Sequence, residues 1–155
     1  MKSSICKGLF LIAFVTLVSC ETKKENNLSQ QIPIVGTWKL FKGIVINKAD
    51  TIITDYTQGT SFIKVINNTH FAFLHHDLEK GKGTAAVFGS GGGSYLLRDS
   101  LYTEHLEYCS DRAWEGNDFT FTVRITNDTL IQSGIEKVEG TNIDRINIEK
   151  YVRVK

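Results

Sequence analysis

Apolar and polar residues alternate along most of the chain after residue 31. The alternation is clearest at 62–66, 119–125 and 146–154, where every second residue is apolar and many are β-branched or aromatic. Successive side chains of a strand point to opposite faces, so this period of two predicts half-buried β-strands. Further strands are predicted at about 34–46, 69–76, 85–88, 101–109 and 129–136, with one short helical insert at 110–116. No long segment shows the 3.6-residue period of an amphipathic helix.

The connectors between these runs predict tight antiparallel hairpins. Asn67-Asn68 and Asn127-Asp128 each separate two runs by residues that accept positive φ, and 98–100 is predicted as a third hairpin turn. The glycine-rich stretch at 89–93 predicts a bulge or loop. Short strands joined by hairpins leave a sandwich or a closed barrel, and closure is favoured because it removes exposed strand edges. We therefore predict an all-β fold for 32–155, an up-and-down antiparallel β-barrel of about eight to ten strands.

The first residues have the pattern of an export signal. Lys2 and Lys7 precede an apolar run at 9–18, which is shorter than the roughly 20 residues that a membrane-spanning helix needs. The run ends in Leu17-Val18-Ser19-Cys20, which resembles the lipobox of bacterial lipoproteins. The resemblance implies cleavage of a signal peptide at 1–19 and acylation of Cys20, palmitate being one such acyl group. The alternative is an ordinary secretory signal that ends near a cysteine.

A lipid at Cys20 predicts a protein held at the membrane of the cell envelope, most simply the outer membrane. Residues 20–31 then form the lipidated cysteine and a polar tether, on either the periplasmic or the surface side. Loss of 1–19 changes the formal net charge from +1 to −1, and no basic patch indicates nucleic-acid binding. Cys109 remains as a single thiol, which is more often a small buried residue than a nucleophile.

Several segments resemble a known family. Gly36-Thr37-Trp38 is similar to the Gly-x-Trp that opens the first strand of lipocalin-like domains. The segments 102–108 and 151–155 look like parts of a family of lipocalin-like bacterial lipoproteins. The resemblance implies that Trp38 packs at the closed end of the barrel with Arg153 across its indole, as a cation–π pair. The other short lipocalin signatures are not evident, so no ligand is implied.

An eight-stranded barrel either is filled by its side chains or holds one small ligand. Phe119 and Phe121 share an inward face, and the apolar face of 101–109 places Glu104 among aromatic residues, where it needs a partner such as Arg153 or a tyrosine hydroxyl. The resemblance turns Tyr151 and Arg153 inward, whereas hydrophobicity alone favours the opposite face of that strand. The candidate ligand-binding residues are Trp38, Leu40, Tyr102, Glu104, Leu106, Tyr108, Phe119, Phe121, Tyr151 and Arg153.

Other chemistries have weak signals. His75 and His76 are adjacent and point to opposite faces of a strand, so no metal site is predicted. No nucleophile, base and orienting group can be assembled, and the glycines near residue 90 fit no phosphate-binding motif, so neither enzyme activity nor a cofactor is expected. The predicted function is a membrane-anchored lipocalin-like lipoprotein that binds a small hydrophobic or amphipathic ligand in the barrel. The alternative is an envelope interaction module with a solid core that docks a protein or glycan through its loops.

Overall fold

Nine antiparallel strands follow one another in the computed structural model, which describes residues 32–155. The predicted signal peptide, Cys20 and the tether lie outside the described residues. The strands are β1 (Gly36–Asn47), β2 (Asp50–Asp55), β3 (Thr60–Ile66), β4 (His70–Asp77), β5 (Phe88–Arg98), β6 (Leu101–Cys109), β7 (Asp118–Thr126), β8 (Thr129–Lys137) and β9 (Asp144–Arg153). One 3₁₀ turn, η1 (Arg112–Trp114), lies within the helical insert predicted at 110–116. No helix in this part of the chain is long and apolar enough to cross a membrane.

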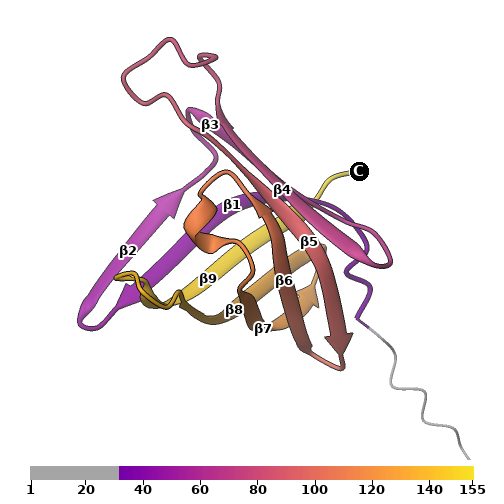
Figure 1. Cartoon of the computed structure of the whole chain (residues 1–155). Helices are drawn as coiled ribbons and strands as arrows, with labels where there is room; N and C mark the ends of the chain where they lie inside the picture. Colours follow the sequence, from indigo (N-terminus) through magenta and orange to yellow (C-terminus); the bar gives the residue numbers. More distant parts are fainter. Residues whose placement is uncertain (1–31) are drawn as a thin grey trace, which may run out of the picture.

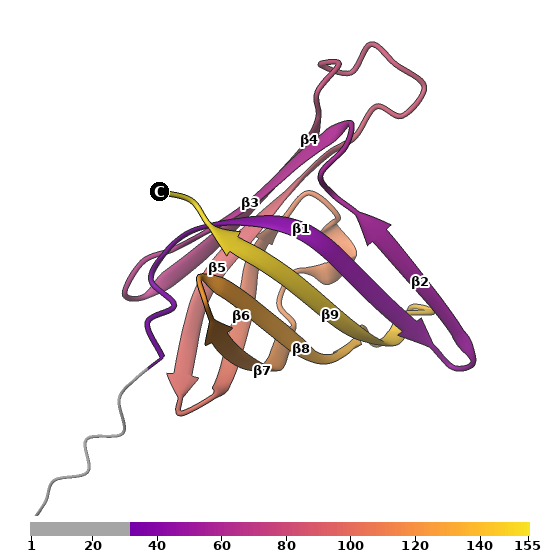
Figure 2. The same ribbon diagram turned by 180° about the vertical axis from the view of Figure 1, so that it is seen from behind.

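Eight of these strands close into a barrel, which confirms the predicted fold class. β1 and β9 pair along most of their length, from Trp38 with Arg153 to Ile46 with Ile146, and the remaining neighbours are consecutive hairpins from β3 to β9 (Figures 1 and 2). On its other side, β1 pairs with β3 through Gly36–Lys39 and with β2 through Lys42–Asn47. β2 is therefore an extra strand that leaves the barrel wall at the end where β1 finishes.

The turns explain how consecutive strands become neighbours. Asn127 and Asp128 have φ of 49° and 59° and form the predicted two-residue hairpin, and Asp99 has φ of 53° in the turn between β5 and β6. The Asn67-Asn68 hairpin is also present, but the expected positive φ is wrong there. Instead, the Asn67 carboxamide oxygen accepts hydrogen bonds from the backbone N–H groups of Thr69 and His70 at 2.8 and 2.7 Å.

Two sequence predictions fail in the strands themselves. β2 is absent from the predictions because all six of its residues are exposed, so it has no alternation of buried and exposed positions. The strand predicted at 85–88 is wrong, since β5 begins at Phe88 and continues through the glycine-rich stretch to Arg98. The predicted bulge is present as a register shift between Gly92 and Gly93. A Cβ on Gly92 would lie 2.5 Å from the Phe71 carbonyl oxygen, so the close approach of β4 requires glycine.

Trp38 closes one end of the barrel, as the family resemblance implies. Its side chain is fully buried, and its indole N–H donates to the Ile34 carbonyl at 2.7 Å. The guanidinium carbon of Arg153 lies 4.0 Å from the centre of the indole ring. Arg153 also donates to the carbonyls of Val35 and Pro33, at 2.9 and 2.7 Å. The first described residues are thus fastened across the closed end.

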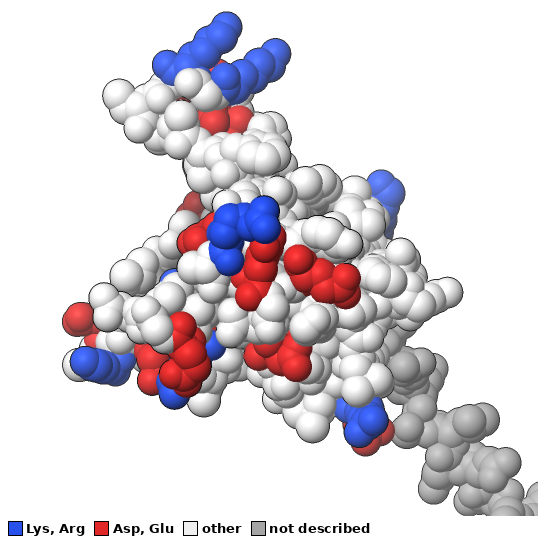
Figure 3. Space-filling view, viewed as in Figure 1, with Lys and Arg blue, Asp and Glu red and all other residues white. Residues whose placement is uncertain are grey.

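The longest connection, residues 78–87 between β4 and β5, projects beyond the opposite end of the barrel (Figure 1). The Asp77 carboxylate holds its base by accepting from the backbone N–H groups of Gly81 and Val87 at 2.9 and 3.1 Å. These hydrogen bonds also lower the pKa of Asp77. Lys80 and Lys82 belong to this projection, whose tip is basic in Figure 3, while charges of both signs are interspersed over the barrel below.

Candidate functional site

The barrel interior contains a cavity of about 370 Å³, here called the barrel cavity, at the end opposite Trp38. Aromatic and aliphatic side chains from β1, β3, β4, β6, β7 and η1 form much of its wall, and polar groups come mainly from β3, β6, β8 and β9. The lining residues are Val45, Tyr56, Phe62, Lys64, Phe73, Glu104, Leu106, Cys109, Ser110, Asp111, Trp114, Phe119, Phe121, Gln132, Glu136, Arg145, Asn147, Glu149 and Tyr151.

Half of the predicted ligand-binding residues line the barrel cavity, namely Glu104, Leu106, Phe119, Phe121 and Tyr151. The choice of face on β9 follows the family resemblance rather than hydrophobicity. Tyr151 is fully buried, whereas Ile146, Val152 and Val154 on the rival face are each more than 40% exposed.

The other predicted residues lie elsewhere. Trp38, Leu40 and Tyr102 are buried in the core but are not among the residues that line the cavity, and Arg153 covers the closed end. The prediction that Tyr108 faces inward is wrong, since its side chain is 68% exposed. The reason is the β5–β6 bulge, where Gly92 pairs with Tyr108 but Gly93 pairs with Leu106. This shift turns Tyr108 outward and places Cys109 on the cavity wall.

Lys64 is the main feature of the cavity that the sequence interpretation missed. Its ammonium nitrogen donates to Glu104 Oε1 at 2.7 Å and to Gln132 Oε1 at 3.1 Å, and the side chain is only 3% exposed. Lys64, rather than Arg153 as predicted, is therefore the cation that pairs with Glu104, and the Tyr102 hydroxyl also interacts with this carboxylate and lowers its pKa. The available signal was the position of Lys64 between Phe62 and Ile66 on one face of β3.

The electrostatics of this pair follow from burial. Burial lowers the pKa of Lys64, but the negative charges of Glu104 and Glu149 outweigh it, so the pKa of Lys64 is raised overall. Burial also raises the pKa of Glu104, an effect that Lys64 opposes. The aromatic rings of Phe71, Tyr102 and Tyr151 surround the ammonium, with centroids 5.6, 6.0 and 5.6 Å from its nitrogen.

A second ion pair lies on the β8–β9 side. Glu136 accepts from Arg145 Nε at its Oε2 atom and from Asn147 Nδ2 at its Oε1 atom, both at 2.7 Å. The Arg145 guanidinium carbon is 5.3 Å from the centre of the Trp114 ring. Burial and the nearby Glu149 charge raise the pKa of Glu136. Glu136 on β8 and Glu149 on β9 therefore both line the barrel cavity, on the same polar wall.

Two further polar groups complete the inner end. Glu149 Oε2 accepts from the Tyr151 hydroxyl at 2.7 Å and lies 4.0 Å from the Lys64 ammonium. The Tyr102 hydroxyl is buried and interacts with the Glu104 carboxylate. Burial, together with the charges of Glu104 and Glu149, raises the pKa of Tyr102, so this phenol stays neutral at physiological pH.

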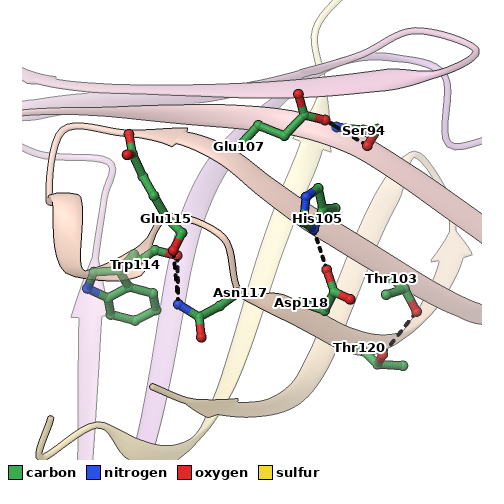
Figure 4. Close-up of polar contacts among 9 residues, drawn as sticks. All are labelled: Ser94, Thr103, His105, Glu107, Trp114, Glu115, Asn117, Asp118 and Thr120. Atoms are coloured by element: carbon green, nitrogen blue, oxygen red, sulfur yellow. Dashed lines mark hydrogen bonds and ion pairs between the residues drawn. The ribbon is translucent and has the colours of Figure 1, made fainter. Parts of the chain in front are cut away.

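The segment after β6 builds one side of the mouth. The Asp111 carboxylate caps η1 by accepting from the Ala113 N–H at 3.3 Å, and η1 carries Trp114 onto the cavity wall. Asn117 then donates to the Trp114 carbonyl at 3.1 Å, which holds the turn in place (Figure 4). The Glu115 carboxylate accepts from the Cys109 N–H at 2.9 Å, which fastens the same turn to the end of β6.

An aromatic cluster forms the other side of the mouth. Tyr56 lies edge-on to Phe62, with ring centroids 5.7 Å apart, and His75 stacks on Phe62 at 5.0 Å. His75 Nε2 is buried without a hydrogen-bond partner in the described structure, and burial together with the neighbouring His76 lowers the pKa of His75.

The remaining candidate chemistries find no assembled group in residues 32–155. No cluster of three histidine, cysteine, aspartate or glutamate side chains is placed to hold a metal ion there. Burial raises the pKa of the Cys109 thiol, so little of the reactive thiolate forms at neutral pH. The arrangement of the cavity is instead suited to holding a molecule with both apolar and polar parts.

Comparisons with known proteins give one distant structural similarity. No family model matches it, and no curated protein is similar to it. Among solved structures, it is similar to the crystal structure of an uncharacterized protein from Bacteroides eggerthii DSM 20697, with a TM-score of 0.45. The two chains are 13% identical, and the match covers 77% of this chain and 98% of the other. No function for this chain follows from that similarity.

Proposed function

We propose that this chain is a lipocalin-like lipoprotein of the cell envelope, anchored through Cys20, that binds a small amphipathic molecule in the barrel cavity. The observation that carries the proposal is the cavity itself, because about 370 Å³ lies within the range of small-molecule sites. A barrel whose interior was packed solid would have no such space. The lipobox and the Gly-x-Trp resemblance supply the expectation of a lipid anchor and of a lipocalin-like family.

The cavity wall matches an amphipathic ligand better than a purely apolar one. Phe62, Phe73 and Phe119 provide apolar surface, whereas Lys64 and Glu149 present charged groups to the same space. A wholly apolar ligand would cover these charged groups without pairing them, which costs free energy. A ligand with one polar head and a short apolar body satisfies both parts of the wall.

The position of the first described residues at the closed end of the barrel agrees with an anchored carrier. The described chain begins at Ile32 beside the closed end, where residues 32–35 line a small pocket together with Asn68, Tyr95 and Leu97. Trp114 of η1 lines the barrel cavity. η1 lies toward the opposite end of the barrel (Figure 1). A lipid at Cys20 would therefore hold the barrel by its closed end and leave the cavity open to the surrounding aqueous space.

Native mass spectrometry tests the ligand part of the proposal. Residues 20–155 with Cys20→Ser, which carry no lipid, would be purified from the soluble fraction without detergent. We expect a retained small molecule that is released on unfolding. Loss of the retained mass after Phe119→Trp, which places a larger side chain on the cavity wall, would locate it in the barrel. A chain that carries no extra mass and binds no amphipathic probe would refute the proposal.

The anchor is tested separately by metabolic labelling with a palmitate analogue. Wild-type chain should incorporate the label and fractionate with membranes, and Cys20→Ser should do neither. Cys109→Ser serves as the matched control, because it removes the other thiol of the mature chain. Equal labelling of wild type and Cys20→Ser would show that the lipid is absent from Cys20.

β2 favours a second candidate function, the docking of an envelope protein. All six of its residues are exposed, and Ile52 and Ile53 are each 61% exposed. β2 pairs with β1 along one edge, and its other edge has no strand partner in the described structure. Such an edge is a ready template for strand addition. A photo-crosslinker at Ile52 should then capture a specific protein in intact cells, and absence of any crosslink would count against this candidate.

A further inference from the structure

The wall of the barrel cavity carries more negative than positive charge. Glu104, Asp111, Glu136 and Glu149 line it together with Lys64 and Arg145, so four acidic and two basic side chains leave a formal net charge of −2 on the wall. A cavity with low-dielectric walls concentrates the field of such a charge, so it discriminates between ligands of opposite sign. The inference below rests on the proposed ligand-binding function and concerns the chemical class of the ligand.

The two basic groups are already paired with two of the three carboxylates that β6, β8 and β9 contribute to the wall. Lys64 lies 2.7 Å from Glu104, and Arg145 lies 2.7 Å from Glu136. Glu149 is left with the neutral Tyr151 hydroxyl as its hydrogen-bond donor, and the nearest basic nitrogen is that of Lys64 at 4.0 Å. Among Glu104, Glu136 and Glu149, it is therefore Glu149 whose charge is least compensated.

The hydrogen-bond chemistry of Glu149 indicates which head group it can pair with. An ionised carboxylate accepts hydrogen bonds and donates none. An ammonium group could donate to the Glu149 carboxylate, which a carboxylate ligand could not do.

Aromatic rings lie next to both cations of the cavity wall. The Lys64 ammonium is surrounded by three aromatic rings within 6.0 Å, and the Arg145 guanidinium lies over Trp114. Aromatic faces attract organic cations and tolerate their alkyl substituents. We propose that the barrel cavity binds a small amphipathic amine or another organic monocation, with its head beside Glu149 and its apolar body against the aromatic wall.

Isothermal titration calorimetry with three matched probes tests this ligand class. The mature chain with Cys20→Ser would be titrated at neutral pH with n-octylamine, n-octanol and n-octanoate, which share one alkyl chain and differ in the charge of the head. We expect octylamine to bind most tightly, by about tenfold or more over octanoate, because a hydrogen bond to a charged group is worth at least that factor. Octanol should fall between them.

The variants locate the head group. Glu149→Gln should weaken octylamine by about tenfold and leave octanol within about threefold, because the amide keeps the shape but loses the charge. Glu107→Gln is the matched control, since it removes the same formal charge from a carboxylate bound to Ser94 away from the cavity (Figure 4). It should change neither affinity. Unchanged octylamine binding by Glu149→Gln would overturn the placement of the head.

The order of affinities of the three probes for the chain with an unaltered cavity tests the inference even where the Glu149→Gln variant fails to fold. Octanoate binding as tightly as octylamine would overturn the preference for a cation and leave the proposed ligand-binding function in place. Failure of all three probes to bind would overturn the proposed function itself, and this inference with it.

Discussion

Replacing Lys64 with methionine tests whether the buried ion pair holds the barrel together. Methionine keeps most of the aliphatic volume but removes an ammonium that lies 2.7 Å from Glu104 and is 3% exposed. The Glu104 carboxylate, itself 9% exposed, is then left without its cation. Breaking a buried pair by removing one partner costs about 3–5 kcal/mol. That is a large share of the roughly 5–15 kcal/mol that stabilises a typical domain.

The double variant Lys64→Met/Glu104→Gln separates an unpaired charge from lost packing. The double variant has no unpaired carboxylate at residue 104, so Glu149, 4.0 Å from the lost ammonium, is the remaining carboxylate that loses its nearby cation. We expect the double variant to regain at least about 2 kcal/mol relative to Lys64→Met. Urea unfolding, followed by tryptophan fluorescence at neutral pH, measures both values, with equal m-values confirming comparable unfolding. The reasoning fails if Lys64→Met costs less than about 1 kcal/mol, or if the double variant is no more stable than the single one.

The pH dependence of the single variant gives an independent check with a defined sign. Burial raises the pKa of Glu104 above its ordinary value of 4.5, and loss of Lys64 removes the group that opposes this. A carboxyl with a raised folded pKa stabilises the fold while it is protonated, and that contribution is lost as pH rises through the folded pKa. The stability gap between Lys64→Met and wild type should therefore narrow as pH falls toward 4.5.

Two further perturbations test the mouth and the bulge. Burial and the neighbouring His76 lower the pKa of His75 from its ordinary value of 6.5. Below pH 6.5 the unfolded chain therefore binds a proton at His75 more readily than the folded chain does. The free energy of unfolding should fall as the pH drops below 6.5. His75→Phe should weaken that dependence in urea titrations at several pH values, and an identical dependence in both proteins would contradict the assignment. Gly93→Ala should cost more than about 2 kcal/mol, since its Cβ would clash with the His105 carbonyl oxygen. Gly89→Ala is the control, because its Cβ would meet its nearest atoms at 4.0 Å. Thermal melts followed by circular dichroism compare the two variants, and equal melting temperatures for Gly93→Ala and Gly89→Ala would refute the steric argument.

The parts of the site that follow from the sequence are those carried by regular alternation. Phe119 and Phe121 lie inside as predicted because β7 has no bulge and keeps its period of two from end to end. On β6 the same reasoning is correct at Glu104 and Leu106 and wrong at Tyr108. A single register shift at Gly92/Gly93 inverts every side chain beyond it. A glycine run predicts that a bulge exists, but the pairing partner determines the residue at which it acts.

The sequence by itself determined the strand periodicity, the hairpins at Asn127-Asp128 and Asp99, and hence a meander that closes as a barrel, because these depend on neighbouring residues. The tertiary structure alone decided that Lys64 meets Glu104, 40 residues away, and that Glu149 lies 4.0 Å from the same ammonium. The physical reason is that a strand pattern tells which side chains share a face, whereas the charge balance of the cavity depends on which faces closure brings together.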